Sequence, residues 1–316
     1  MSVPILSRVA EAFYWINRYV ERAESYARFL EANQSIHLDM GHSRNEQWYP
    51  LIQTMGDQEA FTDRYQGATA NSTIHFMAFD RENPNSIVSC LDQVKWNSRS
   101  VREMVSQELY EHITLFHQMV AIAEAKYSNN EADDFFGLVK FCASAFEGIM
   151  EASMLHSTGW HFGRMGRYIE RADKTTRLLD MKYFIILPEG HAVGSALDIL
   201  QWTSILKSIS GFIAFQRRRT ALSAFHIARF LLLDPEFPRS LRYCLNNIVQ
   251  SLAYISVEHE HARELVGRAR SFQRELDILN MEQIFQTGLH EYLDETQREL
   301  NELHRQIHSC FNLDQH

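Results

Sequence analysis

The sequence predicts an all-α protein, a bundle of long helices built from two duplicated halves that are related by a pseudo-twofold axis. Helix-breaking residues are scarce, since the 316 residues include only six prolines and 13 glycines, and no proline lies between Pro84 and Pro188. Apolar residues recur with the period of a helix, and alternating strand-like runs are not evident. A motif that occurs twice in the chain indicates the duplication.

The repeated motif has the pattern F-x4-R-Y-[VI]-E-R-A-[ED]-x3-R-x-L and covers residues 13–30 and 162–179, 149 positions apart. At about 100° per residue, each copy forms a helix with one apolar face and one polar stripe. Because both stripes keep the same order of Arg and Glu, we expect a specific buried or ligand-facing network between them. The stripes consist of Arg18, Glu21, Ser25 and Arg28 in the first copy and of Arg167, Glu170, Lys174 and Arg177 in the second.

A second stretch is also repeated, at an offset of 154 residues. Residues 82–91 and 236–245 share a Glu, a Pro, a Ser and a Cys-Leu pair at the same spacing. The repeating unit is therefore about half the chain, and no low-complexity linker separates the two units. We predict a single helical domain over residues 1–316, with one half at about 1–130 and the other at about 131–316.

The first half opens with a helix that carries the first motif and is longer than the roughly 25 residues of most globular helices, which suits a bundle. A turn over residues 80–85 follows two short helices, and Asn85 is the predicted N-cap of the next helix. The predicted helices of this half cover residues 7–39, 49–55, 70–79 and, between 86 and 126, two helices that meet near Tyr110.

The second half begins after a break at Asn129 and Asn130. A helix is predicted over residues 132–157, and Gly159 is its predicted C-terminal stop. Trp160 then opens the helix of the second motif, which runs to about residue 184. The remaining predicted helices cover residues 197–216, 220–233 and 240–257, followed by helical sequence to Cys310 with a break near Gly267.

Composition excludes several classes of protein. The formal net charge of −9 argues against a general nucleic-acid-binding protein. The four cysteines form no C-x-x-C pair, so we expect buried, reduced thiols in a cytoplasmic protein. Arg8 and Glu11 interrupt any signal-peptide hydrophobic region, and no apolar run reaches the roughly 18 residues of a membrane span.

The duplicated motif has two interpretations. In the first it binds an anion or a carboxylate, because arginine presents planar, bidentate donors, while Glu21 and Glu170 orient the guanidinium groups, receive a substrate ammonium or act as catalytic bases. In the second it is an ion-pair network that fixes the register of two helices. The candidate ligand-binding residues are Arg18, Arg22, Arg28, Arg167, Arg171, Arg177 and Lys174.

Other motifs give weaker signals. Glu21/Glu24 and Glu170/Asp173 have a metal-like spacing, but no Glu-x-x-His supports them and the intervening arginines oppose a cation, so no metal or cofactor is predicted. No G-x-S-x-G, P-loop or G-x-G-x-x-G sequence occurs. The basic run over residues 216–219 is interpreted as a solvated face or as a docking site for an acidic partner or a phosphate.

The repeated motif and several other stretches make the chain resemble the alpha-E family, bacterial helical proteins named for their Glu-Arg motif. The sequence departs from the usual pattern at Asn17, where a Gly is common, at Tyr110, where a Trp is common, and at Ile213, where an acidic residue is common. The resemblance covers nearly the whole chain. It is close at residues 82–87, 101–103, 159–162, 167–180, 230–234 and 237–240.

The resemblance also implies partners. Members of the family are typically encoded beside ATP-grasp ligases and transglutaminase-like proteins, which implies a role near amide-bond chemistry. We therefore expect an accessory or binding component that works with such a protein on a small carboxylate or peptide ligand. Two alternatives remain: an enzyme that itself catalyses acyl or aminoacyl transfer in a polar cleft between the halves, and a purely structural helical scaffold.

Overall fold

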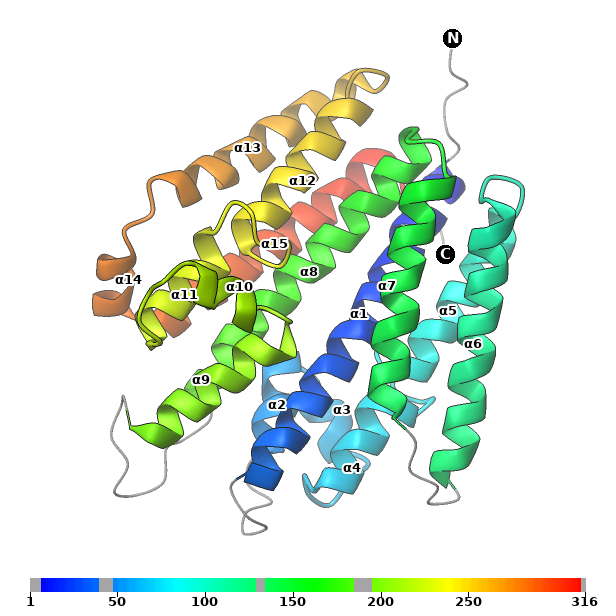
Figure 1. The fold of residues 1–316 in the computed structure, drawn as a ribbon. Coiled ribbons are helices and arrows are strands. Elements are labelled where there is room, and N and C mark those ends of the chain that lie inside the picture. The colour runs from blue at the N-terminus through cyan, green and yellow to red at the C-terminus, as the bar shows by residue number, and fades with distance from the viewer. Residues whose placement is uncertain (1–6, 40–47, 129–133, 185–194, 314–316) are drawn as a thin grey trace.

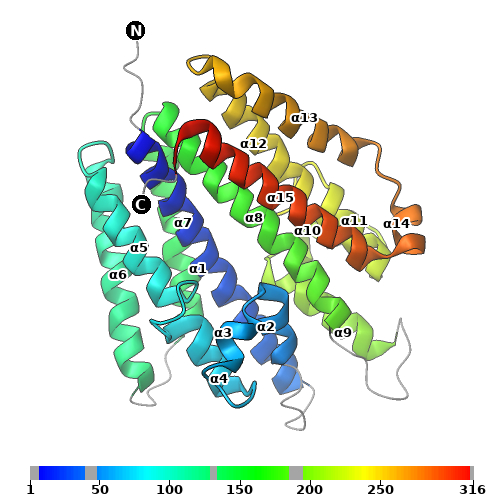
Figure 2. The same cartoon turned by 180° about the vertical axis from the view of Figure 1, so that it is seen from behind.

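The computed structural model describes residues 7–39, 48–128, 134–184 and 195–313, and in these ranges it contains helices and no strand, as the sequence predicts. The two motif helices, α1 (Ser7–Asp39) and α8 (Thr158–Phe184), pack against each other in the middle of the molecule (Figure 1). The remaining helices surround this central pair (Figure 2). None of the described helices is both long and apolar enough to cross a membrane.

The helices that follow α1 in the chain cover one side of the central pair. Helix α5 packs along α1, α6 packs on α5, and α7 packs on both α6 and α1 (Figure 1). The short α-helix α4 continues without a break into the π-helical turn η2. The elements are α2 (Tyr49–Met55), α3 (Gln58–Thr62), α4 (Ala70–Ile74), η2 (His75–Phe79), α5 (Ile87–Ser100), α6 (Gln107–Ser128) and α7 (Phe135–Ser153).

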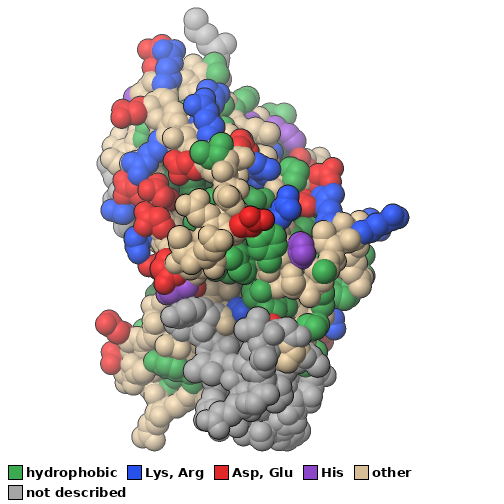
Figure 3. Space-filling model, turned by 90° about the vertical axis from the view of Figure 1, so that its left-hand side faces the viewer, with side chains coloured by type: hydrophobic (Ala, Val, Ile, Leu, Met, Phe, Trp, Pro, Cys, Tyr) green, Lys and Arg blue, Asp and Glu red, His purple; other side chains and the backbone are tan. Residues whose placement is uncertain are grey.

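The helices that follow α8 cover the other side in a comparable way. Helix α12 packs along α8, α13 lies outside α12, and α15 returns to contact α8 (Figure 2). On the side where α13 and α14 lie, acidic and basic side chains are interspersed over the surface (Figure 3). The elements are α9 (Ala196–Ser208), α10 (Phe212–Arg217), α11 (Ala224–Leu233), α12 (Leu241–Ile255), η3 (Glu260–Ala262), α13 (Arg263–Asp277), α14 (Met281–Thr287) and α15 (Leu289–Phe311).

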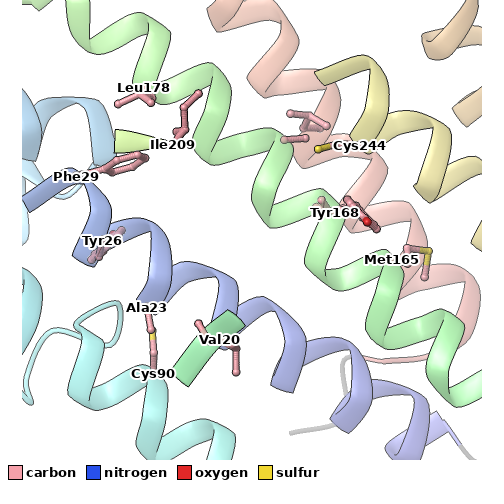
Figure 4. Packing of buried hydrophobic residues seen from close by; sticks show 14 of the residues in the cluster. Val20, Ala23, Tyr26, Phe29, Cys90, Met165, Tyr168, Leu178, Ile209 and Cys244 are labelled. Carbon is pink, nitrogen blue, oxygen red and sulfur yellow. The ribbon is translucent and has the colours of Figure 1, made fainter. Parts of the chain in front are cut away.

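Close packing of α1 on α8 depends on Gly166. A Cβ atom at this position would lie 2.3 Å from the carbonyl oxygen of Tyr14, far inside the contact distance of the two atoms. The absence of a side chain at Gly166 therefore permits the close approach of the backbone of the other motif helix. On the opposite side of α8, Met165 and Tyr168 are buried where the helix faces α12 and α15 (Figure 4).

The turn that leads into α5 is held by one aspartate. Asp80 accepts a hydrogen bond from the backbone N–H of Glu82 (2.9 Å) and forms an ion pair with Arg64 (2.7 Å). The helix then begins after Ser86, whose side chain accepts from the backbone N–H of Ser89. Ser86 is thus the N-cap, and the prediction of Asn85 is wrong by one residue.

The turn that leads into α12 is built in the same way. Asp234 accepts from the backbone N–H of Glu236 (2.9 Å) and pairs with Arg218 (2.6 Å). Ser240 is the N-cap, and its side chain accepts from the backbone N–H of Tyr243. Arg218 belongs to the basic run, and its ion pairs with Asp234 and Glu236 (2.7 Å) tie that run to this turn.

Several predicted helix ends are wrong. The break assigned near Tyr110 lies instead over residues 101–106, between α5 and α6. Gly159 does not stop a helix, because α7 ends at Ser153 and Gly159 lies in the first turn of α8. One predicted helix is divided at Ser210, whose φ is 54°, which separates α9 from α10. Gly267 lies inside α13. The predicted break at residues 129 and 130 lies outside the described residues.

The cysteines occupy the positions expected of reduced thiols. All four are free, and Cys90, Cys142 and Cys244 are buried. Cys90 points toward Ala23 of α1 (Figure 4), and burial raises the pKa of the Cys90 thiol to about 12. Burial likewise raises the pKa of Cys244 to about 12. These thiols act as small apolar side chains of the core.

Candidate functional site

The two polar stripes face each other across the contact between α1 and α8. Glu170 is fully buried and Glu21 is 2% exposed. Each glutamate binds an arginine of the other copy: Arg22 of the first motif pairs with Glu170, and Arg171 of the second pairs with Glu21. The helical spacing of the motif therefore brings the two glutamates, Arg22 and Arg171 to one buried, reciprocal contact.

Glu170 binds two arginines from α1. Arg22 donates from Nε to Oε1 (2.7 Å) and from Nη2 to Oε2 (3.0 Å), while Arg18 donates from Nε to Oε2 (2.8 Å). Arg22 also donates from Nη1 to Asn85 (2.6 Å). Both oxygens of the Glu170 carboxylate are thus occupied by guanidinium groups.

The Glu170 group continues along α8. Lys174 lies 3.5 Å from Glu170 and 3.0 Å from Asp173. Arg177 pairs with Asp173 (2.9 Å) and donates to the backbone carbonyl of Thr54 in α2 (2.9 Å). This row of charges ties α8 to both α1 and the short helix α2.

Glu21 binds arginines from two other helices. Arg171 donates from Nε to Oε1 (2.9 Å) and from Nη2 to Oε2 (2.7 Å), which is a bidentate pair. Arg239, just before α12, donates to Glu21 (2.8 Å) and to Glu24 (2.7 Å). Arg28 also pairs with Glu24 (2.6 Å). The Glu21 group therefore joins α1, α8 and the start of α12.

Arg167 does not contact Glu21. It donates to the side-chain carbonyl of Asn17 (3.0 Å) and pairs with Glu147 of α7 (2.9 Å). Glu147 also pairs with Arg171 (2.9 Å) and its side chain is 38% exposed. Asn17 thus has a polar partner in the second motif helix.

Electrostatics in the network favour the ionised carboxylates. Burial alone would raise the pKa of Glu170, but the charges of Arg22, Arg18 and Lys174 hold it well below its usual range. The same balance of burial against arginine charges lowers the pKa of Glu24, Glu147 and Asp173 to about 2 each.

Aromatic side chains and a histidine cover the Arg18 end of the network. Tyr14 hydrogen-bonds His304 of α15 (2.8 Å between Oη and Nδ1), and Arg18 Nη1 lies 3.0 Å from the same ring nitrogen. Burial and the Arg18 charge lower the pKa of His304 to about 2. Arg18 also lies over the ring of Trp15, 5.0 Å from its centroid. A neutral His304 therefore closes this end of the network.

All of the predicted site residues lie in the network, whereas sequence reasoning missed residues from other helices. Glu147, Arg239, Asn85 and His304 lie outside the motif and have no helical period that links them to it. Arg239 and Asn85 carried a signal, since they stand at equivalent positions of the two repeated stretches. In the described part of the chain, no group of three or more His, Cys, Asp or Glu side chains is placed to hold a metal ion.

Comparison with known proteins places the chain in a family. It is 24% identical over 266 residues to an uncharacterized protein of Mycobacterium bovis, and 24% and 23% identical to two uncharacterized proteins of Mycobacterium tuberculosis. Each match covers 76% of this chain but only 29% of the longer relative. No solved structure matches significantly. A family model described as Alpha-E, a predicted alpha-helical domain with a conserved ER motif, matches residues 5–311, and the chain therefore belongs to the Alpha-E family.

Proposed function

We propose that this protein is an accessory or binding component that acts with an ATP-grasp-type ligase, or with a transglutaminase-like protein, in the synthesis or modification of peptides or amides. Its Arg/Glu network binds a small anionic or carboxylate-bearing ligand. The protein works in the cytoplasm, where four free cysteines remain reduced. The partner class is implied by membership of the family, and the ligand class by the charges of the network.

The observation that carries the proposal is a surplus of buried positive charge. Among the residues that the structure describes, the network holds eight cationic side chains and six carboxylates. The six include Asp57, which accepts from Asn85 (3.2 Å). An uncompensated charge in a buried setting is costly, so an anion that joined the network would be held by charge-assisted hydrogen bonds. The cations are Arg18, Arg22, Arg28, Arg167, Arg171, Lys174, Arg177 and Arg239, and the other carboxylates are Glu21, Glu24, Glu147, Glu170 and Asp173.

The enzymatic alternative has less support. A general base should have a pKa near the working pH and a free oxygen that faces the substrate. Glu170 has neither, because its pKa is well below the usual range and both of its oxygens accept from arginines. Both oxygens of Glu21 are likewise occupied, by Arg171 and Arg239. These contacts suit ligand binding or helix registration better than proton transfer.

We also propose that the domain consists of two duplicated halves related by a pseudo-twofold axis. Four observations support this: the reciprocal pairing of the motif glutamates, the matching turns before α5 and α12, the packing of α5 on α1 as of α12 on α8, and the contacts of α7 with α1 and of α15 with α8. Because α7 covers the first motif helix, we place the junction of the halves between α7 and α8, later than residue 130.

Ligand binding is tested by thermal denaturation in low salt with L-glutamate, a glutamate-containing dipeptide, phosphate or sulfate. A ligand at about 100 times its Kd should stabilise the protein by about 2.7 kcal/mol. The effect should disappear in Arg22→Lys, which loses the bidentate geometry, and should persist in Arg298→Lys, an exposed control whose side chain is 64% accessible. If none of these anions stabilises the wild type, the network is structural.

The partner is tested separately by co-purification with an ATP-grasp ligase encoded beside it. We expect a complex and no turnover by this protein alone. Turnover by the purified protein that Glu170→Gln abolishes without unfolding it would establish the enzyme instead. Absence of both a complex and turnover would contradict the accessory role.

A further inference from the structure

A groove with a volume of about 650 Å³ opens between the first part of α1 and the last part of α5. It lies beside the Arg/Glu network but is distinct from it, since none of the network's charged side chains lines it. Three aromatic rings, two guanidinium groups and several amide or hydroxyl groups face it. Its lining consists of Arg8, Glu11, Trp15, Tyr19, Gln93, Trp96, Asn97, Arg99 and Ser100.

The lining is ordered along the groove because the two helices are antiparallel (Figures 1 and 2). Gln93 and Tyr19 lie toward the end nearer the Cys90–Ala23 contact shown in Figure 4, and the aromatic rings of Trp15 and Trp96 follow. Arg8 and Arg99 lie toward the opposite end. The groove thus has an aromatic middle part and a cationic end, with Glu11 as the one carboxylate of its lining.

The aromatic wall on α1 is fixed before any ligand arrives. The rings of Trp15 and Tyr19 stack on each other, 5.2 Å apart and 26° from parallel. Arg18 lies 5.0 Å from the centroid of Trp15, and Arg22 lies 5.7 Å from that of Tyr19. Since both arginines are held by Glu170, the wall is rigid. By contrast, the side chain of Trp96 is 69% exposed. Such exposure is unusual for a large apolar ring, because contact of the ring with water is unfavourable.

The corresponding helix pair of the second half, α8 and α12, packs together without such an open groove between the equivalent residues, which lie in the described part of the chain. Arg164 of α8 stands 149 residues after Trp15. Its guanidinium donates to Asn247 and, at 3.2 Å, to Gln250 of α12. These two residues stand 154 positions after Gln93 and Trp96, which line the groove on α5. It also lies over Trp160, 5.3 Å from the ring centroid. One arginine therefore bridges the two helices there, whereas the first half keeps its groove open.

We propose that the α1–α5 groove binds a small anion that carries a flat aromatic ring. The ring stacks between Trp15 and Trp96, and the anionic group pairs with Arg8 and Arg99. Nucleoside monophosphates and aromatic carboxylates share this chemistry. The proposal stands independently of any ligand at the Arg/Glu network.

The test is isothermal titration of the full-length protein with AMP and with N-acetylphenylalanine. Adenosine and inorganic phosphate serve as controls, because each carries only one of the two recognised groups. We expect at least one of the two ring-bearing anions to bind, about tenfold or more tightly than either control, since stacking on an aromatic side chain and charge pairing both contribute. Binding of AMP alone identifies a nucleotide site, and binding of N-acetylphenylalanine alone identifies a carboxylate site.

Variants copied from the second half of the chain make the test specific to the groove. Trp96→Gln should weaken binding about tenfold or more, because it removes one stacking surface. It should leave the melting temperature unchanged, since Trp96 is 69% exposed. Trp15→Arg should also weaken binding, and Leu115→Gln on α6, 53% exposed and outside the groove, should not. No binding of either anion at 10 mM, or equal binding in Trp96→Gln, would overturn the proposal.

Discussion

Replacing Glu170 with Gln should be among the most destabilising single changes in this protein. Glu170 is fully buried, and its carboxylate accepts hydrogen bonds of 2.7–3.0 Å from Arg18 and Arg22. The amide oxygen of Gln can accept from one guanidinium, but its NH2 group must then face the other. Breaking a buried ion pair by removing one partner costs about 3–5 kcal/mol, because a buried charge loses its counter-charge.

This free energy converts into a measurable shift of the melting temperature. At about 2.1 cal/mol/K per residue, the 316 residues have an unfolding entropy of about 0.66 kcal/mol/K, so the expected decrease is about 5–8 °C. Calorimetry at neutral pH and low salt measures it, with Glu295→Gln as the matched control. Glu295 also pairs with an arginine, but its side chain is 62% exposed, so its change should stay below about 1 °C. A Glu170→Gln variant that melts within 1 °C of the wild type would refute the reasoning.

Three further outcomes follow from the same structure. Gly166→Asn should lower the melting temperature and any ligand affinity more than Asn17→Gly does, because a Cβ at Gly166 would lie 2.3 Å from a backbone oxygen of α1; equal effects in parallel melts and titrations would contradict this. The folded pKa of His304 is about 2 against 6.5 for the unfolded chain, so the unfolded state binds the extra proton and stability is lost as the pH falls below 6.5. Melting temperatures of His304→Gln should therefore vary less between pH 6.5 and 4.5 than those of the wild type, and an identical pH profile would exclude His304 as the cause. Of the four cysteines, Cys310 alone is not buried, so a thiol reagent should label it first under native conditions, as peptide mapping would show.

Most helices were predictable because their signals are local. The predicted limits of the first motif helix and of the short helix after it agree with α1 (Ser7–Asp39) and α2 (Tyr49–Met55). Some errors arose where tertiary packing outweighs a local breaker. Gly267 is an example: a glycine costs a helix about 1 kcal/mol relative to Ala, but Leu265, Val266 and Ala269 bury their side chains around it and keep α13 continuous.

The sequence by itself determined that the chain is helical, that its motif is duplicated and that the charges of each copy share one face of a helix. These properties depend on residues three or four positions apart, which any helix brings together. Tertiary structure alone decided which charges meet. Arg22 reaches a glutamate 148 residues away, and Arg239 reaches Glu21 across 218 residues. A buried carboxylate is stabilised by whichever cation the fold brings within hydrogen-bond distance, and no period in the sequence encodes that distance.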